Sequence, residues 1–134
     1  GPLDNVYYTD EYFQDKKVNY RGVIEPSKVL KTLSNYDVLI LPTYHKGEGY
    51  PGIFIEAMSL GIPIICTKWN ALDEIVQNDF NGKLIDVRSS SKLREAMESF
   101  NELNYGFFSK NSLEKFNEFN IDNTIEKLIN LYLK

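Results

Sequence analysis

Two carboxylates, Glu48 and Glu56, lie eight positions apart, and the segment between them holds glycines and an apolar run. Residues 37–41 are mostly apolar and predict a buried strand that leads straight into this segment, with a helix after it. The free N–H groups at the start of such a helix, together with its dipole, suit a phosphate. Gly49 and Gly52 would let the backbone approach a ligand closely. Carboxylates beside a phosphate site can hold hydroxyl groups, and a nucleotide sugar offers both kinds of group.

Three features of this region have alternative interpretations. Paired carboxylates are also typical of glycoside hydrolases, but a strand–loop–helix order favours a phosphate ligand. His45 has no partner cluster of cysteines or histidines, so we expect a surface-loop or acceptor-side histidine rather than a metal ligand or a general base. Trp69 is either a platform for sugar stacking or a packing residue, and both interpretations stay open.

The bulk properties are those of an ordinary globular domain. The chain has 134 residues, of which 43% are hydrophobic, and we expect one domain over residues 1–134. A formal charge of −4 gives no basic footprint for nucleic acid. No apolar run approaches membrane-spanning length, and no secretory signal opens the chain. The single cysteine, Cys66, is predicted to be buried in a strand and fits a reducing compartment. Gly1-Pro2-Leu3 is either a cloning scar or native sequence.

Apolar runs alternate with helical patterns along the chain. Pro51 fits the first position of a helix, Gly61 a helix end, and Asn70 a helix cap. Asn81-Gly82 predicts a turn. The expected strands cover residues 18–21, 37–41, 62–67 and 83–87. The expected helices cover residues 26–36, 52–60 and 70–78, one helix carrying Leu93, Ala96, Met97, Phe100 and Leu103, one carrying Leu113, Phe116 and Phe119, and one carrying Ile121 to Tyr132.

This alternation predicts an α/β fold, an open parallel sheet flanked by helices. Ligands of such sheets bind beyond the carboxyl ends of the strands. Three loops are expected there, 22–25, 43–51 and 68–70, and the loop at 43–51 is the longest and most polar. Residues 1–17 show no clear period, and we expect them to be poorly ordered or to depend on a partner.

The order of the motifs resembles that of group 1 retaining glycosyltransferases with the GT-B fold, over residues 18–134. The resemblance implies a Rossmann-like domain, the donor-binding C-terminal half of such an enzyme, whose acceptor-binding N-terminal domain would lie upstream and is missing here. The matching pieces are YRGV at 20–23, DVLILP at 37–42, EGYP at 48–51, EAMSLGIPII at 56–65, EIV at 74–76 and NGKL at 81–84.

The resemblance also implies roles for single residues. Glu48, as the catalytic residue, would lie near the donor sugar, and Glu56 would accept hydrogen bonds from the ribose hydroxyls. Backbone amides at 50–53 would hold the diphosphate, and the backbone at 23–24 would meet the base. Where the family often has paired glycines, this chain has Trp69-Asn70-Ala71. The expected donor-binding residues are Val23, Ile24, Gly49, Tyr50, Pro51, Gly52, Ile53, Glu56, Trp69 and Asn70.

The expected function is therefore transfer of a sugar from a UDP- or GDP-sugar to a glycan or lipid-linked acceptor, with no metal or other cofactor. The family's basic pair that contacts the diphosphate would lie upstream, so we expect the isolated fragment to be inactive, although Lys46 and Lys68 are candidates for that contact. The alternative is a non-catalytic nucleotide-binding module that acts with a partner chain. We expect a cytoplasmic location, with the inner membrane surface left open for the full-length protein, and no nucleic-acid partner. An uncovered sheet edge would favour self-association of the fragment.

Overall fold

The computed structural model describes residues 18–133, without the side chains of residues 122, 123, 126 and 127. The expectation for residues 1–17 lies outside this range. Within it, the sheet has three parallel strands in the order β1-β2-β3. These strands are β1 (Leu39–Leu41), β2 (Ile64–Thr67) and β3 (Gly82–Ile85). The central strand pairs Ile65 with Ile40 on one side and with Lys83 on the other. The predicted parallel sheet is confirmed.

Alternate side chains of the central strand enter two different apolar clusters, as the two-residue period of a strand requires. Ile64 and Cys66 pack with α3 (Gly52–Ser59) and with α4 (Leu72–Ile75). Ile65 packs on the opposite face with α5 (Ser90–Glu98). All four residues of β2 are buried, so this strand is the rigid centre of the molecule.

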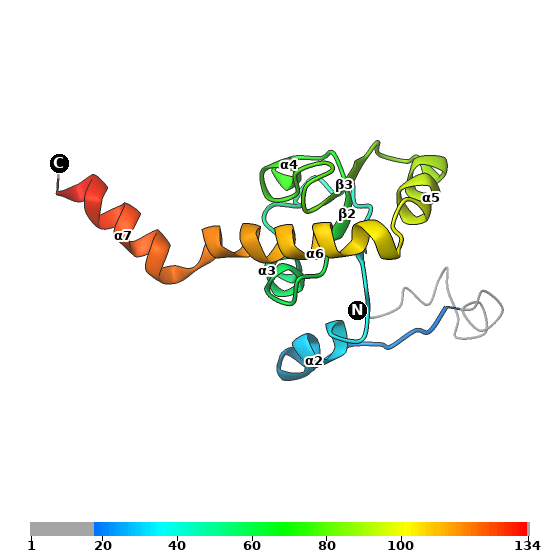
Figure 1. Cartoon of the computed structure of the whole chain (residues 1–134), viewed down its shortest axis with the longest axis horizontal. Coiled ribbons are helices and arrows are strands. Elements are labelled where there is room, and N and C mark those ends of the chain that lie inside the picture. The colour runs from blue at the N-terminus through cyan, green and yellow to red at the C-terminus, as the bar shows by residue number, and fades with distance from the viewer. Residues whose placement is uncertain (1–17, 134) are drawn as a thin grey trace.

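The remaining helices lie around this layered core. The 3-10 helix η1 (Pro26–Lys28) and α2 (Val29–Leu33) precede β1, and Leu33 packs against the core. The long helix α6 (Glu102–Phe116) lies against α3, and the 3-10 helix η2 (Asn117–Phe119) and α7 (Ile121–Tyr132) follow it. Figure 1 shows α7 extending away from the sheet. None of the helices described between residues 18 and 133 is both long and apolar enough to cross a membrane.

Two helix ends have side chains or backbone angles typical of helix caps, and of these the end at Gly61 was predicted. The Ser89 hydroxyl accepts a hydrogen bond from the Lys92 amide at 3.3 Å and caps α5. Gly61 has a φ of 68° directly after the end of α3, in the left-handed region that glycine adopts at low cost. Gly82 has another role, because a Cβ there would collide with the backbone of Ile64. A glycine therefore lets β3 lie close to β2.

Four sequence-based assignments need correction. Residues 18–21 are not a strand, because Val18 is half exposed and no neighbouring strand pairs with it among the described residues. Asn70 does not cap α4, whose N-cap is Ala71. The turn predicted at Asn81-Gly82 lies at residues 79–81, so that Asn81 ends it and Gly82 begins β3. The helix expected to carry both Leu93 and Leu103 ends at Glu98, and Leu103 lies in α6.

Other expected elements are present with shorter bounds. The helix expected at 26–36 consists of η1 and α2, which end at Leu33. The strand expected at 83–87 ends at Ile85. Polar residues at these ends form local hydrogen bonds, as between the Asn35 side chain and the Lys31 carbonyl at 2.7 Å, and they take the place of further backbone pairing.

Cys66 lies in the middle of β2 and is fully buried. Burial, with a smaller contribution from Asp73, raises the pKa of its thiol to about 12. The prediction of a buried strand cysteine is confirmed.

Candidate functional site

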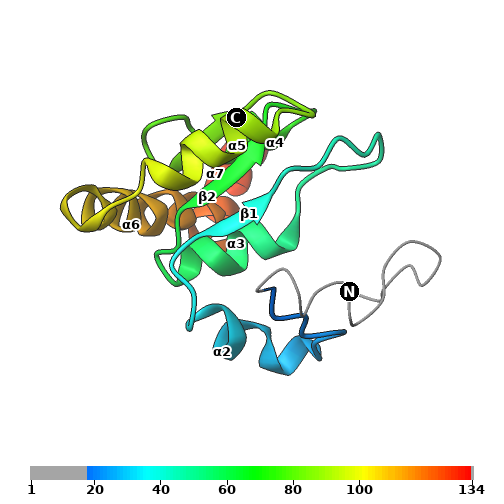
Figure 2. The same cartoon turned by 90° about the vertical axis from the view of Figure 1, so that its right-hand side faces the viewer.

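The loop of residues 42–51 joins β1 to α3 and projects beyond the carboxyl ends of the strands (Figure 2). It contains a tight turn in which the Glu48 amide donates to the His45 carbonyl at 3.0 Å. The His45 ring accepts a hydrogen bond from the Gly47 amide at 3.2 Å through Nδ1. His45 thus shapes the loop.

This loop is held by residues that follow β2. The Asn70 side-chain amide donates to the Glu48 carbonyl at 2.8 Å and to the Lys46 carbonyl at 3.3 Å. The Trp69 indole Nε1 donates to the His45 carbonyl at 2.8 Å. The Thr67 hydroxyl donates to the Thr43 carbonyl. The loop therefore takes its position from the buried central strand.

Asn70 departs from its predicted role as a helix cap, and Trp69 fits one of its two interpretations. Asn70 has a φ of 48°, a left-handed conformation that asparagine tolerates, and this places its amide over the loop rather than over the start of α4. Trp69 is half buried and packs against the core cluster that contains Leu72. Its packing role is thereby supported, and its indole N–H serves to hold the loop.

The two carboxylates of the sequence motif lie on either side of the start of α3. Glu48 lies in the loop and Glu56 in the second turn of α3, about 6 Å along the axis from Gly52. Both are half buried. Pro51 is the N-cap rather than the first helical residue, and its ψ of 120° turns the chain into the helix.

The backbone between the carboxylates faces open space. A Cβ built on Gly49 or on Gly52 would meet nothing within 4 Å. The first amides of α3, at Gly52 and Ile53, have no acceptor inside the helix by its geometry. The Ile53 side chain packs against the core, so this residue can offer a ligand only its backbone. This arrangement can accept an anion near a carboxylate.

Tyr50 links the loop to α4. Its phenol donates a hydrogen bond to the Glu74 carboxylate, and this bond is the main reason that the pKa of Tyr50 is raised. Tyr50 is 55% exposed, so the bond lies at the surface. Glu74, which sequence reasoning left outside the site, therefore positions a loop residue.

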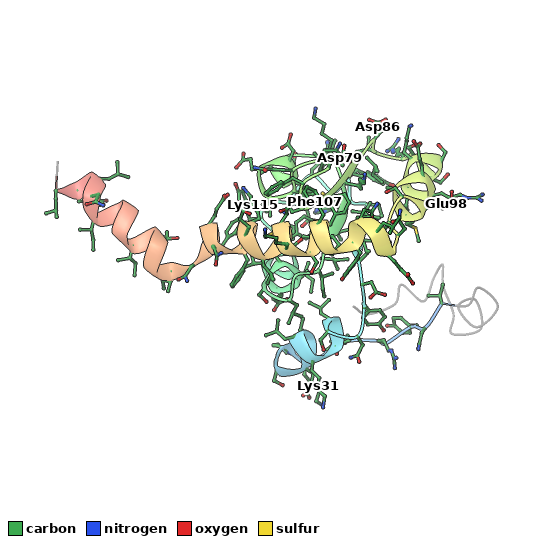
Figure 3. All side chains as sticks on the ribbon, in the orientation of Figure 1. Lys31, Asp79, Asp86, Glu98, Phe107 and Lys115 are labelled. Atoms are coloured by element: carbon green, nitrogen blue, oxygen red, sulfur yellow. The ribbon has the colours of Figure 1, made fainter. Side chains whose placement is uncertain are left out.

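Val23 and Ile24 lie elsewhere, after Gly22, whose φ is 68°. They line a hollow of about 760 Å³ along η1 and α2, and Val23 is 73% exposed. Lys31 also lines this hollow and extends from α2 away from the sheet (Figure 3). The expected site residues thus fall into two groups, one around residues 48–56 with Trp69 and Asn70, and one at residues 23–24.

Two side chains near the loop were missed by sequence reasoning. The Arg88 guanidinium lies over the Tyr44 ring, 4.9 Å from its centre. Arg88 follows β3 by three residues, so its loop also leaves the carboxyl edge of the sheet. The rule that such loops carry binding residues could have identified it. Among residues 18–133, no group of three or more histidines, cysteines, aspartates or glutamates could hold a metal ion.

Known proteins have sequences similar to that of this chain. An Escherichia coli protein called UDP-Gal:alpha-D-GlcNAc-diphosphoundecaprenol alpha-1,3-galactosyltransferase is 30% identical over 135 residues, covering 92% of this chain and 34% of the relative. A Campylobacter jejuni protein called N,N'-diacetylbacillosaminyl-diphospho-undecaprenol alpha-1,3-N-acetylgalactosaminyltransferase is 27% identical over 85 residues, covering 63% of this chain and 22% of the relative. The chain spans about a third, or less, of the length of the curated relatives it matches.

The solved structure of sucrose-phosphate synthase from Thermosynechococcus elongatus has a similar fold. Its TM-score is 0.75 at 24% identity, over 91% of this chain and 31% of that one. Together with the parallel sheet and its flanking helices, this likeness identifies a Rossmann-like fragment of a GT-B fold. The sequence profile of the family Glycosyl transferases group 1 matches residues 6–120. The chain therefore belongs to the group 1 glycosyltransferase family.

Proposed function

We propose that this chain is the donor-binding domain of a retaining glycosyltransferase that transfers a sugar from a nucleotide sugar to a glycan or lipid-linked acceptor. Family membership supports the class of reaction. One observation carries the donor-binding part of the proposal. The open backbone at Gly49 and Gly52 lies between two half-buried carboxylates and is held in place by bonds from Trp69 and Asn70.

The start of α3 would bind the diphosphate of the donor. Its first amides and the positive end of its dipole attract an anion. Because Gly49 and Gly52 have no side chain, the space beside them is open to phosphate oxygens. A larger side chain at either glycine would occupy this space. No metal is needed for such an interaction, because amides and the dipole meet the charge.

The carboxylates would bind hydroxyl groups on either side of that diphosphate. A carboxylate accepts hydrogen bonds at two oxygens, which matches the neighbouring hydroxyls of a ribose. Glu56, one turn into α3, would bind the ribose, and Glu48 would orient the donor sugar at the reacting face. The backbone at Val23 and Ile24 would contact the base across the hollow that these residues line.

The acceptor is proposed from the relatives. The names of two relatives specify sugars joined by a diphosphate to undecaprenol. A lipid-linked acceptor of this class would bring the full-length protein to the inner membrane surface. The transfer itself would need the remaining part of the enzyme, so we expect this chain alone to bind donor without transferring sugar.

Ligand-observed NMR with UDP, GDP, UDP-glucose and GDP-mannose tests donor binding on this chain. We expect one base to be preferred, and binding to require the diphosphate. Glu56→Gln should weaken binding about tenfold, because a charge-assisted hydrogen bond to a ribose hydroxyl is lost. Glu114→Gln is the matched control, since Glu114 is an exposed glutamate on α6. Equal affinities for the two variants would contradict the role of Glu56.

The non-catalytic alternative differs in what the full-length protein does. A nucleotide-binding module would bind the same donor and respond to Glu56→Gln in the same way, yet it would form no glycosidic product from it. Full-length protein should convert the preferred nucleotide sugar in the presence of a lipid-linked acceptor, and Glu48→Gln should reduce the rate while keeping nucleotide affinity. Failure of transfer with every donor that binds would favour the module.

A further inference from the structure

A hollow of about 690 Å³ lies at the loop of residues 42–51, here called the donor loop. Of the residues expected above to contact the donor, it contains Trp69 and Lys46. It is open to solvent at the carboxyl edge of the sheet. Loops after all three strands contribute to it, and its lining residues are Thr43, Tyr44, His45, Lys46, Trp69 and Arg88. Two aromatic rings and two cations thus meet in one place.

Arg88 is held in position before any ligand arrives. Its φ of 57° is uncommon for a residue with a side chain, and its guanidinium lies 4.9 Å from the centre of the Tyr44 ring. Within residues 18–133 it forms no ion pair with a carboxylate, so its donors stay available to an anion. A guanidinium is well suited to bind the oxygens of a phosphate in pairs.

The opposite side of the hollow is equally well fixed. The Lys46 carbonyl accepts from Asn70, and the His45 carbonyl accepts from the Trp69 indole. These bonds set the backbone from which the Lys46 side chain extends. Lys46 also forms no ion pair among the described residues. The hollow is therefore a preformed cationic site with aromatic walls.

Aromatic walls and cations together fit one chemical class of ligand. Sugar rings present C–H faces that pack on aromatic rings, while phosphate oxygens need cationic donors. We propose that this hollow is a subsite for a phosphorylated sugar on the acceptor side of the reaction, distinct from the nucleotide-sugar site. The proposal rests on the proposed function. The hollow would lie on the acceptor side only if the neighbouring loop, which contains Lys46 and Glu48, binds the donor.

Trp69 is the only tryptophan of the chain, so its indole N–H gives a single NMR signal at the hollow. The test is a titration of this chain with glucose 1-phosphate, followed by that signal. We expect a saturable shift in the millimolar range, a weaker response to inorganic phosphate, and none to methyl α-glucoside at the same concentrations. An equal response to methyl α-glucoside would overturn the proposal, because the phosphate would then contribute nothing.

Arg88→Gln should weaken glucose 1-phosphate binding about tenfold, the size of one lost charge-assisted hydrogen bond. Arg94→Gln is the matched control, because Arg94 lies exposed on α5 and pairs with Glu98 at 2.7 Å. Equal affinities in these two variants would overturn the proposal. Lys46→Gln gives a second test, with a loss in the same direction.

Nucleotide binding distinguishes this subsite from the donor site. Glucose 1-phosphate should still shift the Trp69 signal when UDP-glucose or GDP-mannose saturates the chain, and displacement would overturn a separate acceptor-side subsite. Arg88→Gln should leave the affinity for the nucleotide sugar unchanged. If no nucleotide binds while the glucose 1-phosphate response depends on Arg88, the donor proposal fails and the sugar-phosphate subsite remains.

Discussion

The hollow at the loop of residues 42–51 and the hollow along η1 and α2 differ in what holds their walls. At the loop of residues 42–51, side-chain hydrogen bonds join residues 22 to 24 positions apart, from Thr67, Trp69 and Asn70. Along η1 and α2, the described side-chain hydrogen bonds stay within four positions, as from Thr32 to Lys28 at 2.8 Å. The ion pair of Lys28 with Glu25, at 3.4 Å, is also local and exposed.

This difference separates a site that is built by the sheet from one that is built by a helix. The long-range hydrogen bonds fix the loop to the end of the buried strand β2. The loop therefore has its geometry before a ligand binds. Local bonds only shape η1 and α2, whose position relative to the sheet depends on packing such as that of Leu33. The diphosphate and sugar would therefore meet a preformed surface. Binding of the nucleotide base would have to order more of the surrounding structure at η1 and α2.

The strongest test of this comparison makes the same substitution in both regions. Thr67→Val removes a buried hydroxyl that donates to the Thr43 carbonyl and should cost about 1–3 kcal/mol of unfolding free energy. Thr32→Val removes an exposed hydroxyl that bonds to the Lys28 carbonyl only four positions away, and it should cost less than about 0.5 kcal/mol. Urea unfolding measures both values. Equal losses would mean that the bond from the central strand carries no special weight.

A smaller effect is expected for the asparagines. Asn70→Gly keeps the left-handed backbone but removes the two bonds to the Lys46 and Glu48 carbonyls. Hydrogen exchange of the Glu48 amide should become about fivefold to tenfold faster, which corresponds to about 1 kcal/mol. Asn35→Gly, which removes a bond to the Lys31 carbonyl, should leave the exchange rate of the Glu48 amide unchanged. Unaltered exchange in Asn70→Gly would show that the loop holds itself.

The smallest effect concerns Tyr50, because its bond to Glu74 is exposed. The folded-state pKa of Tyr50 lies above its ordinary value, so the bond stabilises the fold below about pH 10 and this stability is lost as the pH rises through the raised pKa. An ultraviolet titration should show a late-titrating tyrosine that returns toward the ordinary range in Glu74→Gln.

Tyr105 is the internal control for this titration. Its pKa is also raised, mainly by burial and then by Asp37, and Glu74→Gln should not change it. A titration curve that is the same before and after Glu74→Gln would remove the proposed link between the loop and α4.

Sequence reasoning succeeded where a local pattern and the tertiary structure agree. The continuous apolar runs at 37–41 and 62–67 contain β1 and β2, and Gly61 marks a helix end as predicted. It failed where a tertiary bond used a residue with a strong local preference. Asn70 has the type and position of a helix cap, yet its amide binds carbonyls more than 20 positions away. A rule based on neighbouring residues alone cannot predict that the Asn70 side chain bonds to the loop instead of capping α4.

The candidate site was predictable in part for the same reason. Glu48, Glu56 and the glycines lie in one continuous motif, and the structure places them around one helix start. Arg88 contacts Tyr44 because the three parallel strands all end at the same edge of the sheet, and because Arg88 has a φ of 57° in the turn after β3. Its position after a strand could have marked Arg88 as a candidate, but its contact with Tyr44, and with it the cationic hollow, is visible only in the fold. The roles of the individual residues stay predictions, as does self-association.

The complete burial of Cys66 makes the protein well suited to spectroscopy with labels attached at introduced cysteines. Its thiol is the only one in the chain, is fully buried, and stays protonated because its pKa is about 12. Thiolates, and not thiols, react with maleimides and similar reagents. A cysteine placed on the surface, for example at Ser90 or Lys31, would therefore be labelled alone in the native protein. A fluorophore or spin label could then report on either hollow without removal of Cys66.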